Sequence, residues 1–465
     1  MPRSTVLVCA AVAQALCSGG ETNAQAITGQ TVAPDPVASS ALAEEVARLR
    51  AEVEALKAEL RAMRPAAASA AVSTPPVPAA SSPPAARASA DPVRIAFKGA
   101  PEFRNGDWSF KPRGRIQIDG GYLDAPASRV RGQRDGRGFT SRIRRAYIGA
   151  QGTIPGGFGY RAEVDLANNS VSWTDLHLTW DRGPFNVTVG QHHPFTSMEQ
   201  LESDLFLTFN ERASFITAFN LERRVGVSAG FRKGAVMANA GVFTDDISAL
   251  GNDGNKSFSA DGRVVWMPKF GDLQLHLGGS LHHRKLGKFQ GSLGQQYRAR
   301  PYIGSTDIRY LDTGVLTVDD ETHHGAELAA NWKRVHFAGE AAWLKVDRPG
   351  PADPLFFGGY AEAGIFLTND SRVYRNGQFD RVVPSRPVGD GGWGALEFNV
   401  RYDHLDLTDA GLGGGVHDGY GAALIWMPTA YVRFLMNYMH LIYDIPSQRP
   451  KFNAEVIGVR TQVDF

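Results

Sequence analysis

Cysteine and long apolar runs are both scarce in this chain of 465 residues. The two cysteines are Cys9 and Cys17, so the rest of the chain can form neither a disulfide framework nor a thiolate metal site. Beyond the extreme N-terminus, no run reaches the roughly eighteen apolar residues of a membrane-spanning helix, which excludes that class of protein. Lysine plus arginine number 49 and aspartate plus glutamate 48, a balance without the basic field that nucleic-acid binding requires.

The chain instead alternates apolar and polar residues with a period of two, which is typical of strands with one apolar face. Segments with this pattern include residues 115–119, 160–166, 175–180, 185–190, 224–231, 396–402 and 432–438. The 51 glycines and 10% aromatic residues suit tight turns and aromatic girdles. A β-sandwich would alternate in the same way and remains the alternative fold.

The last thirteen residues decide between the two folds. Towards the end of this segment, the odd-numbered positions are mostly apolar and the even-numbered positions mostly polar. The final residue is the aromatic Phe465. Outer-membrane barrels end on such a strand, because it must pair with the first strand and leave no free edge in lipid. We therefore expect an all-β transmembrane barrel over residues 95–465, closed at Phe465.

The alternation of tight turns with longer polar connections predicts the number of strands. Both ends of such a barrel lie on the periplasmic side, so the number must be even. Placing one strand between successive connections gives sixteen antiparallel strands, provided that residues 298–310 belong to an external loop and 369–390 to a periplasmic excursion.

Three segments precede the expected barrel. Residues 1–26 have the pattern of a secretion signal ending in Ala-Gln-Ala; lipidation at Cys17 is the alternative. Residues 40–64 contain apolar positions at alternating gaps of four and three, which predict a short periplasmic α-helical coiled coil between subunits, or a single amphipathic helix lying on another surface. Residues 65–94 are rich in proline, alanine and serine and predict an extended tether.

The connection 193–222 is too long and too apolar for a loop in solvent. Its side chains include Phe206, Phe209 and Phe215, and a long loop with its own apolar anchors folds back onto the protein. We expect it to fold onto the inner wall and narrow the lumen as a constriction. The alternative is an external loop that packs on its neighbours or on another subunit.

Short motifs along the expected barrel carry a resemblance to a known family. They are Gly114-Arg115-Ile116-Gln117-Ile118-Asp119, Phe209-Asn210-Glu211-Arg212, Arg223-Arg224-Val225-Gly226, Phe366-Leu367-Thr368 with Tyr374, Gly394-Ala395-Leu396-Glu397-Phe398, Arg401-Tyr402 and Leu405-Asp406-Leu407. In order and spacing the chain resembles the phosphate-selective porin O and P family. The resemblance implies a trimeric outer-membrane channel of sixteen strands, with an inward third loop and a preference for anions such as phosphate.

The charges expected in the lumen depart from that family. Residues 193–222 contain no lysine and one arginine, whereas phosphate-selective members are similar in having lysines near the constriction. The basic residues predicted for the anion path are Arg115, Arg145, Arg161, Arg212, Arg224, Arg401, Arg433 and Arg460. The acidic residues predicted for the constriction loop are Glu199, Glu202, Asp204 and Glu211. The arginines could guide anions, or the mixed charges could form ion pairs that stiffen the wall.

Neither catalysis nor a resident metal is expected. The pairs His192-His193, His282-His283 and His323-His324 place adjacent side chains on opposite faces of a strand, so no pair chelates by itself. We found no ordered Ser, His and Asp or Asn set on the outer wall, so an outer-membrane hydrolase is the weakest hypothesis. We expect no cofactor.

These patterns together predict an outer-membrane porin for passive diffusion of small anionic or neutral solutes, with its N-terminal segment in the periplasm. Its expected partners are outer-membrane lipid and two further copies in a homotrimer, and not nucleic acid. The alternative function is a structural anchor of the outer membrane whose barrel is largely plugged.

Overall fold

The computed structural model describes residues 93–126, 137–251, 257–286 and 294–465. The predicted signal peptide and coiled coil, and all but the last two residues of the predicted tether, lie outside the described residues. None of the described helices has the length and apolar character of a membrane span.

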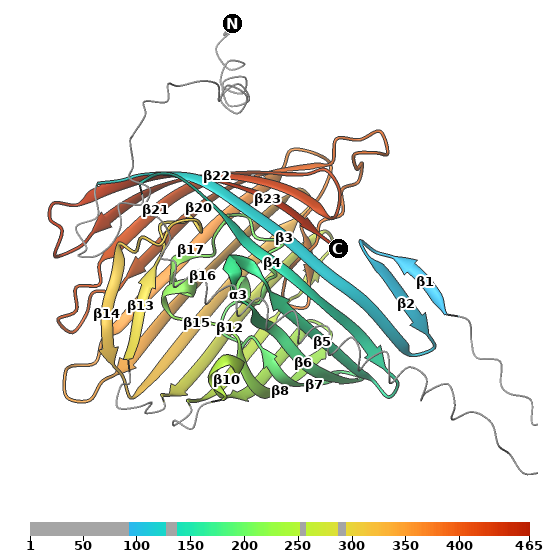
Figure 1. Ribbon diagram of the computed structural model, residues 1–465, viewed down its shortest axis with the longest axis horizontal. Coiled ribbons are helices and arrows are strands. Elements are labelled where there is room, and N and C mark those ends of the chain that lie inside the picture. Colours follow the sequence, from blue (N-terminus) through green and yellow to red (C-terminus); the bar gives the residue numbers. More distant parts are fainter. Residues whose placement is uncertain (1–92, 127–136, 252–256, 287–293) are drawn as a thin grey trace, which may run out of the picture. The chain divides into compact units, whose positions relative to one another are not determined.

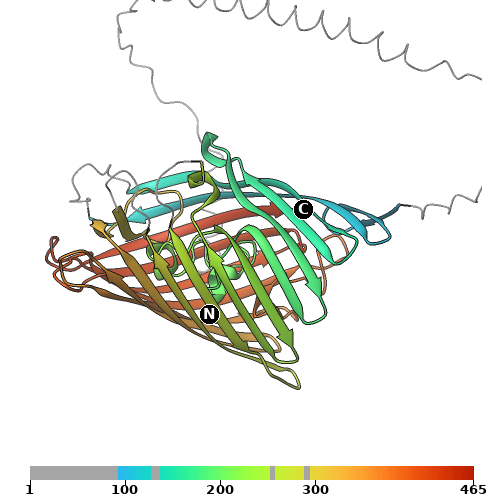
Figure 2. The ribbon, with the colours of Figure 1, turned by 90° about the horizontal axis from the view of Figure 1, so that it is seen from below.

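Nineteen strands form one sheet, and sixteen of them close into an antiparallel barrel (Figures 1 and 2). The sixteen are β3 (Trp108–Asp124), β4 (Gly138–Ile154), β5 (Phe158–Asp165), β6 (Ser172–Arg182), β7 (Phe185–His192), β8 (Arg224–Lys233), β9 (Val236–Phe243), β10 (Phe258–Trp266), β12 (Leu273–Lys285), β15 (Asp320–Trp332), β16 (Val335–Asp347), β17 (Leu355–Phe366), β20 (Ala395–Asp406), β21 (Val416–Met427), β22 (Val432–Asp444) and β23 (Phe452–Asp464). The predicted all-β barrel of sixteen antiparallel strands is confirmed.

The remaining elements lie in connections or at the start of the sheet. They are β1 (Arg94–Phe97), β2 (Pro101–Asn105), β11 (Lys269–Phe270), β13 (Gly294–Ala299), β14 (Leu311–Thr317), β18 (Val373–Arg375), β19 (Gln378–Asp380), the α-helices α3 (Met198–Leu201) and α4 (Ser214–Ala218), and the 3₁₀-helices Ala167–Asn169 and Ile247–Ala249. The pairs β13–β14 and β18–β19 are separate two-stranded sheets outside the barrel ladder. They belong to the long connections 286–319 and 367–394, which is why neither adds to the strand number.

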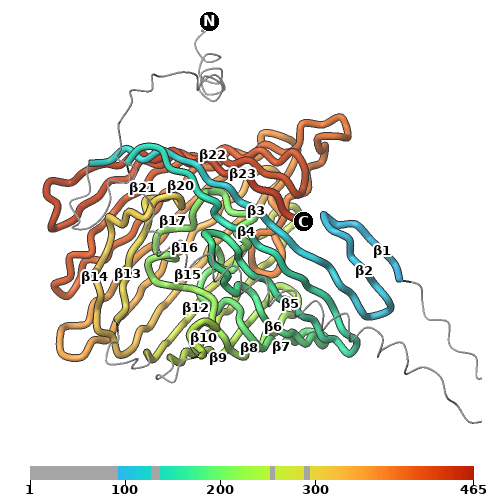
Figure 3. Tube along the Cα trace, in the orientation of Figure 1, coloured from blue at the N-terminus to red at the C-terminus, as the bar shows by residue number. Residues whose placement is uncertain are grey.

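The barrel closes where β23 pairs with β3, with Asp464 opposite Arg115. One residue further, Phe465 and Gly114 exchange backbone hydrogen bonds of 2.9 and 3.1 Å. A Cβ atom on Gly114 would lie 2.1 Å from the Phe465 ring, so any larger residue would have to displace that ring from the joint. Beyond it, β1 and β2 form a hairpin along the start of β3 (Figure 3).

Side chains alternate across the wall as the sequence predicts. On β3, Ile116 and Ile118 are 45% and 50% exposed on the outer face, whereas Gln117 and Asp119 are buried on the inner face. On β23, Val459 is exposed and Arg460 is buried. An apolar outside and a polar inside are what a barrel in lipid requires.

We expect Gly114→Ala to slow barrel closure, because its methyl group displaces the Phe465 ring from the joint. The matched control is Gly262→Ala in β10, where the nearest atom to an added Cβ is 3.9 Å away. Folded barrel can be measured by its heat-dependent mobility on a gel over time after dilution from urea. Equal folding rates for the two variants would contradict a role of this contact in closure.

Candidate functional site

Residues 193–223 connect β7 to β8 and pack against inward side chains of the barrel; we call them the crossing segment. Figures 1 and 2 show its helices α3 and α4 among the strands of the barrel. The Ser197 side chain caps α3 by accepting a hydrogen bond of 3.2 Å from the N–H of Gln200. Phe209, Phe215 and Phe219 are fully buried, so the apolar residues noted in the sequence form the core of this segment.

Carboxylates of the wall hold the first helix of the crossing segment. Glu340 of β16 accepts hydrogen bonds from the N–H groups of Met198, at 3.0 Å, and Glu199, at 2.7 Å. Hydrogen bonds to a carboxylate are stronger than those between neutral groups. This side chain therefore fixes the start of α3 on the wall.

Arg401 of β20 connects the crossing segment to a second strand. Its guanidinium donates to Glu199 at 2.5 Å and to Glu362 of β17 at 2.6 Å, and Glu362 also accepts from the Thr208 hydroxyl at 2.6 Å. Arg401 is 3% exposed and Glu362 4%. Buried charges need partners of this quality to offset their lost hydration, so the three groups act as one unit.

A β-bulge in β4 allows two adjacent arginines to contact the crossing segment. In β4, Arg145 pairs with Gln117 and Ile143 with Ile118, which leaves Arg144 as an extra residue. A bulge interrupts the alternation of faces. Arg144 therefore reaches Glu211 at 3.0 Å while Arg145 reaches Asp204 at 2.5 Å.

Asp204 and Glu211 are held as charged groups by these arginines. Asp204 also pairs with Arg115 of β3. Burial raises the pKa of Glu211, but Arg144, with weaker contributions from Arg460 and Arg145, more than offsets burial and lowers that pKa to about 2. Both carboxylates are therefore ionised at neutral pH.

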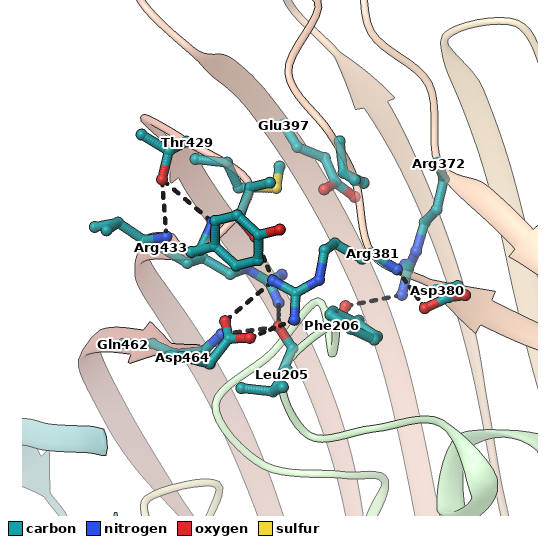
Figure 4. Close-up of a pocket in the computed structure, with 15 residues that line it drawn as sticks. Leu205, Phe206, Arg372, Asp380, Arg381, Glu397, Thr429, Arg433, Gln462 and Asp464 are labelled. Atoms are coloured by element: carbon teal, nitrogen blue, oxygen red, sulfur yellow. Dashed lines mark hydrogen bonds and ion pairs between the residues drawn. The ribbon is translucent and has the colours of Figure 1, made fainter. Parts of the chain in front are cut away.

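The connection 367–394 joins β17 to β20 at the end of the barrel that has the short turns, and it contacts the crossing segment. Arg372 donates to Glu202 at 2.6 Å, and Arg381 pairs with Asp464 near the barrel joint. Figure 4 shows Arg381 and Arg433 among the residues that surround Leu205 and Asp464. Arg433 donates to the carbonyl oxygen of Leu205 at 2.7 Å. Two connections from opposite ends of the barrel thus share one contact region.

A cavity of about 910 Å³ remains between the crossing segment and strands β3 to β7; we call it the chamber. Eleven arginine and lysine side chains line it against six carboxylates. The basic ones are Lys111, Arg113, Arg115, Arg144, Arg145, Arg161, Arg212, Arg223, Arg300, Arg375 and Arg381. The chamber is therefore cationic, although the whole chain has a net charge of only +1.

The arginines singled out in the sequence fall into two groups. Arg115, Arg145, Arg161 and Arg212 line the chamber, as do the acidic Glu202, Asp204 and Glu211, whereas Glu199, Arg224, Arg401, Arg433 and Arg460 do not. Arg460 makes two bonds of 2.7 Å to Asp119, and Arg212 donates to the carbonyl oxygens of Glu199 and Glu202 at 2.9 and 2.8 Å. Arg224 is buried near the carbonyl oxygen of Asn220, at 3.5 Å. Most of these guanidiniums thus have partners within the protein.

Seven basic residues of the chamber were not predicted: Lys111, Arg113, Arg144, Arg223, Arg300, Arg375 and Arg381. The last three lie in the connections 286–319 and 367–394. Lys111 and Arg113 have the same parity as Arg115, so extending the first strand by four residues would have found them. A period of two could not have found Arg144, because the bulge shifts it to the inner face. Arg223 lies outside a strand, at the end of the crossing segment.

We expect Arg401→Met to lower the free energy of unfolding by about 3–5 kcal/mol. It leaves Glu199 buried without its cation and Glu362 with only the longer contact of 3.6 Å to Arg372. The triple variant Arg401→Met/Glu199→Gln/Glu362→Gln removes all three charges and should recover most of that loss. Thermal unfolding in detergent measures both. A single variant as stable as the parent protein would contradict the described unit.

Comparison with solved structures returns other barrels of low sequence identity. OmpT of Vibrio cholerae is 12% identical, with 77% of this chain and 99% of that chain covered and a TM-score of 0.49. An anion-selective porin from Comamonas acidovorans is 13% identical, with 76% and 99% covered and a TM-score of 0.48. The outer membrane channel DcaP of Acinetobacter baumannii is 12% identical, with 78% and 99% covered and a TM-score of 0.48. These values are too low to carry over an ion preference or an oligomeric state.

Sequence comparison is more specific. An uncharacterized protein of Caulobacter vibrioides is 42% identical over 462 residues, which cover 95% of this chain and 92% of that protein. The family model described as phosphate-selective porin O and P matches residues 110–465, which include all sixteen strands of the barrel except the first two residues of β3. The chain therefore belongs to the phosphate-selective porin O and P family of outer-membrane channel proteins.

Proposed function

We propose that the protein is an outer-membrane porin for small hydrophilic solutes that prefers anions, phosphate among them. Membership of a porin family and the closed barrel point to a channel rather than an enzyme. The observation that carries the anion preference is the cationic chamber, with eleven basic and six acidic side chains on its wall. Such a wall raises the local concentration of anions and lowers that of cations.

In this proposal the crossing segment is the constriction. Its contacts with β3, β4, β16 and β20 run through buried charges, so it would keep its place while solutes pass. On the side of β3, β4 and β5, the wall of the chamber includes the side chains of Arg115, Arg145 and Arg161. The path of anions would therefore follow strands β3 to β5.

A structural anchor with a plugged barrel remains the second candidate. It is favoured by the contact region where the crossing segment meets the connection 367–394, because Arg372, Arg381 and Arg433 fill that part of the lumen. Discrete ion currents through the purified protein in planar bilayers would separate a porin from a plugged barrel.

We expect the reversal potential under a potassium chloride gradient to show preference for chloride over potassium. Arg161→Glu should shift it towards potassium, because Arg161 lines the chamber with its side chain 34% exposed. The matched control is Arg182→Glu, an exposed arginine at the end of β6 that does not line the chamber. A parent protein selective for potassium would contradict the proposed preference.

We also propose a homotrimer held in part by a periplasmic coiled coil over residues 40–64. Deleting residues 42–63 should slow trimer assembly and lower trimer stability, because in this proposal the helix buries its narrow apolar stripe against the other copies. The barrel itself should still fold. Light scattering and the melting of trimers on gels measure the effect, and unchanged assembly kinetics would remove the coiled coil from the proposal.

A further inference from the structure

Two arginines of the chamber share one neutral hydrogen-bond acceptor. Arg113 of β3 donates to Oε1 of Gln151 in β4 at 2.6 Å, and Arg161 of β5 donates to the same oxygen at 3.2 Å. Like charges brought together over an uncharged oxygen repel each other. An anion at this position would relieve the repulsion.

The acidic residues near this pair compensate it incompletely. Arg161 contacts Asp175 at 3.2 Å, but Asp175 also accepts from Arg223 at 2.7 Å. Arg113 has only a long contact with Glu163, at 3.5 Å, and Glu163 also faces Arg115. The Nε atom of Arg113 makes this contact with Glu163; it is buried and forms no hydrogen bond with any described residue. Positive charge is therefore in excess here, and Arg113 lacks a close anionic partner.

Lys111 adds a third cation to this group and lies where two cavities meet. Its ammonium donates to the carbonyl oxygen of Lys98 at 2.7 Å, a contact that ties it to the hairpin of β1 and β2. Lys111, Gln151 and Arg161 line both the chamber and a second cavity of about 700 Å³ beside the turns Gly106-Asp107 and 154–157. A solute that moves from one cavity to the other passes this group.

We propose that Lys111, Arg113 and Arg161, arranged around Gln151, form a binding site for an oxyanion, either a carboxylate or a phosphate group. Guanidinium forks match the paired oxygens of both groups, and Lys111 contributes a point charge. The inference rests on the proposed anion permeation. It adds a binding site where the chamber meets the second cavity. Chloride, which has no paired oxygens, would pass the site with less retention.

The test is block of the chloride current through the complete protein in planar bilayers, with inorganic phosphate or succinate as probe. The parent protein should show saturable block. Gln151→Glu provides an internal carboxylate of nearly the same shape for both guanidiniums, and should raise the concentration for half-block by about ten-fold or more. Arg113→Gln should act in the same direction.

Arg182→Gln is the matched control, because it removes one positive charge at the same end of the barrel without touching the chamber wall. Its half-block concentration should equal that of the parent protein. Heat-dependent gel mobility confirms that each variant forms a barrel, and the isosteric Gln151→Glu keeps the test decisive should Arg113→Gln fold poorly.

Each result has a defined consequence. Block by both probes supports a general oxyanion site, and block by one alone assigns the site to phosphates or to carboxylates. Saturable block that Gln151→Glu leaves unchanged, or chloride selectivity without saturable block, overturns the site but not the proposed function. Potassium selectivity together with block that Gln151→Glu weakens would overturn the proposed function and leave the site standing.

Discussion

The closure of β23 on β3 is the constraint on which the rest of the structure depends. A sheet in lipid can leave no backbone donor or acceptor unpaired, and here the ladder continues around all sixteen strands and ends at the exchange between Gly114 and Phe465. Closure with every neighbouring pair antiparallel requires an even number of strands, and it gives every strand one inner and one outer face. All polar side chains of the strands must then share one enclosed space.

That enclosed space explains why so many arginines are bonded within the protein. Arg401 and Arg460 are nearly fully buried and each faces carboxylates. Such pairs do more to position the crossing segment than to increase stability, because the cost of desolvating both charges offsets most of their attraction. The guanidiniums that stay partly exposed, such as Arg113 and Arg161, are the ones left to meet solutes.

Much of the fold followed from periodicity, because inner and outer faces alternate with a period of two. The strand number and the inward orientation of Arg115, Arg145 and Arg460 were predictable in this way. Arg144 was not, because the bulge turns two adjacent side chains towards the crossing segment, which a strict period of two does not allow. The meeting of Arg372 with Glu202 was also beyond the sequence, since it depends on two long connections that enter the barrel from opposite ends.

The starting point of β3 was missed for a related reason. Ile116 and Ile118 mark the even-numbered positions of this strand as apolar, but the preceding even-numbered residues are Pro112 and Gly114. Proline is also disfavoured inside a sheet. In the structure, residues 111–113 pair only with β4, because β2 ends its pairing at Phe110 and the chain ends opposite Gly114. A proline is tolerated at such an edge. The same short stretch carries Lys111 and Arg113. A place where the backbone ladder is one-sided is therefore also a place where the positive charge of the wall is only partly compensated.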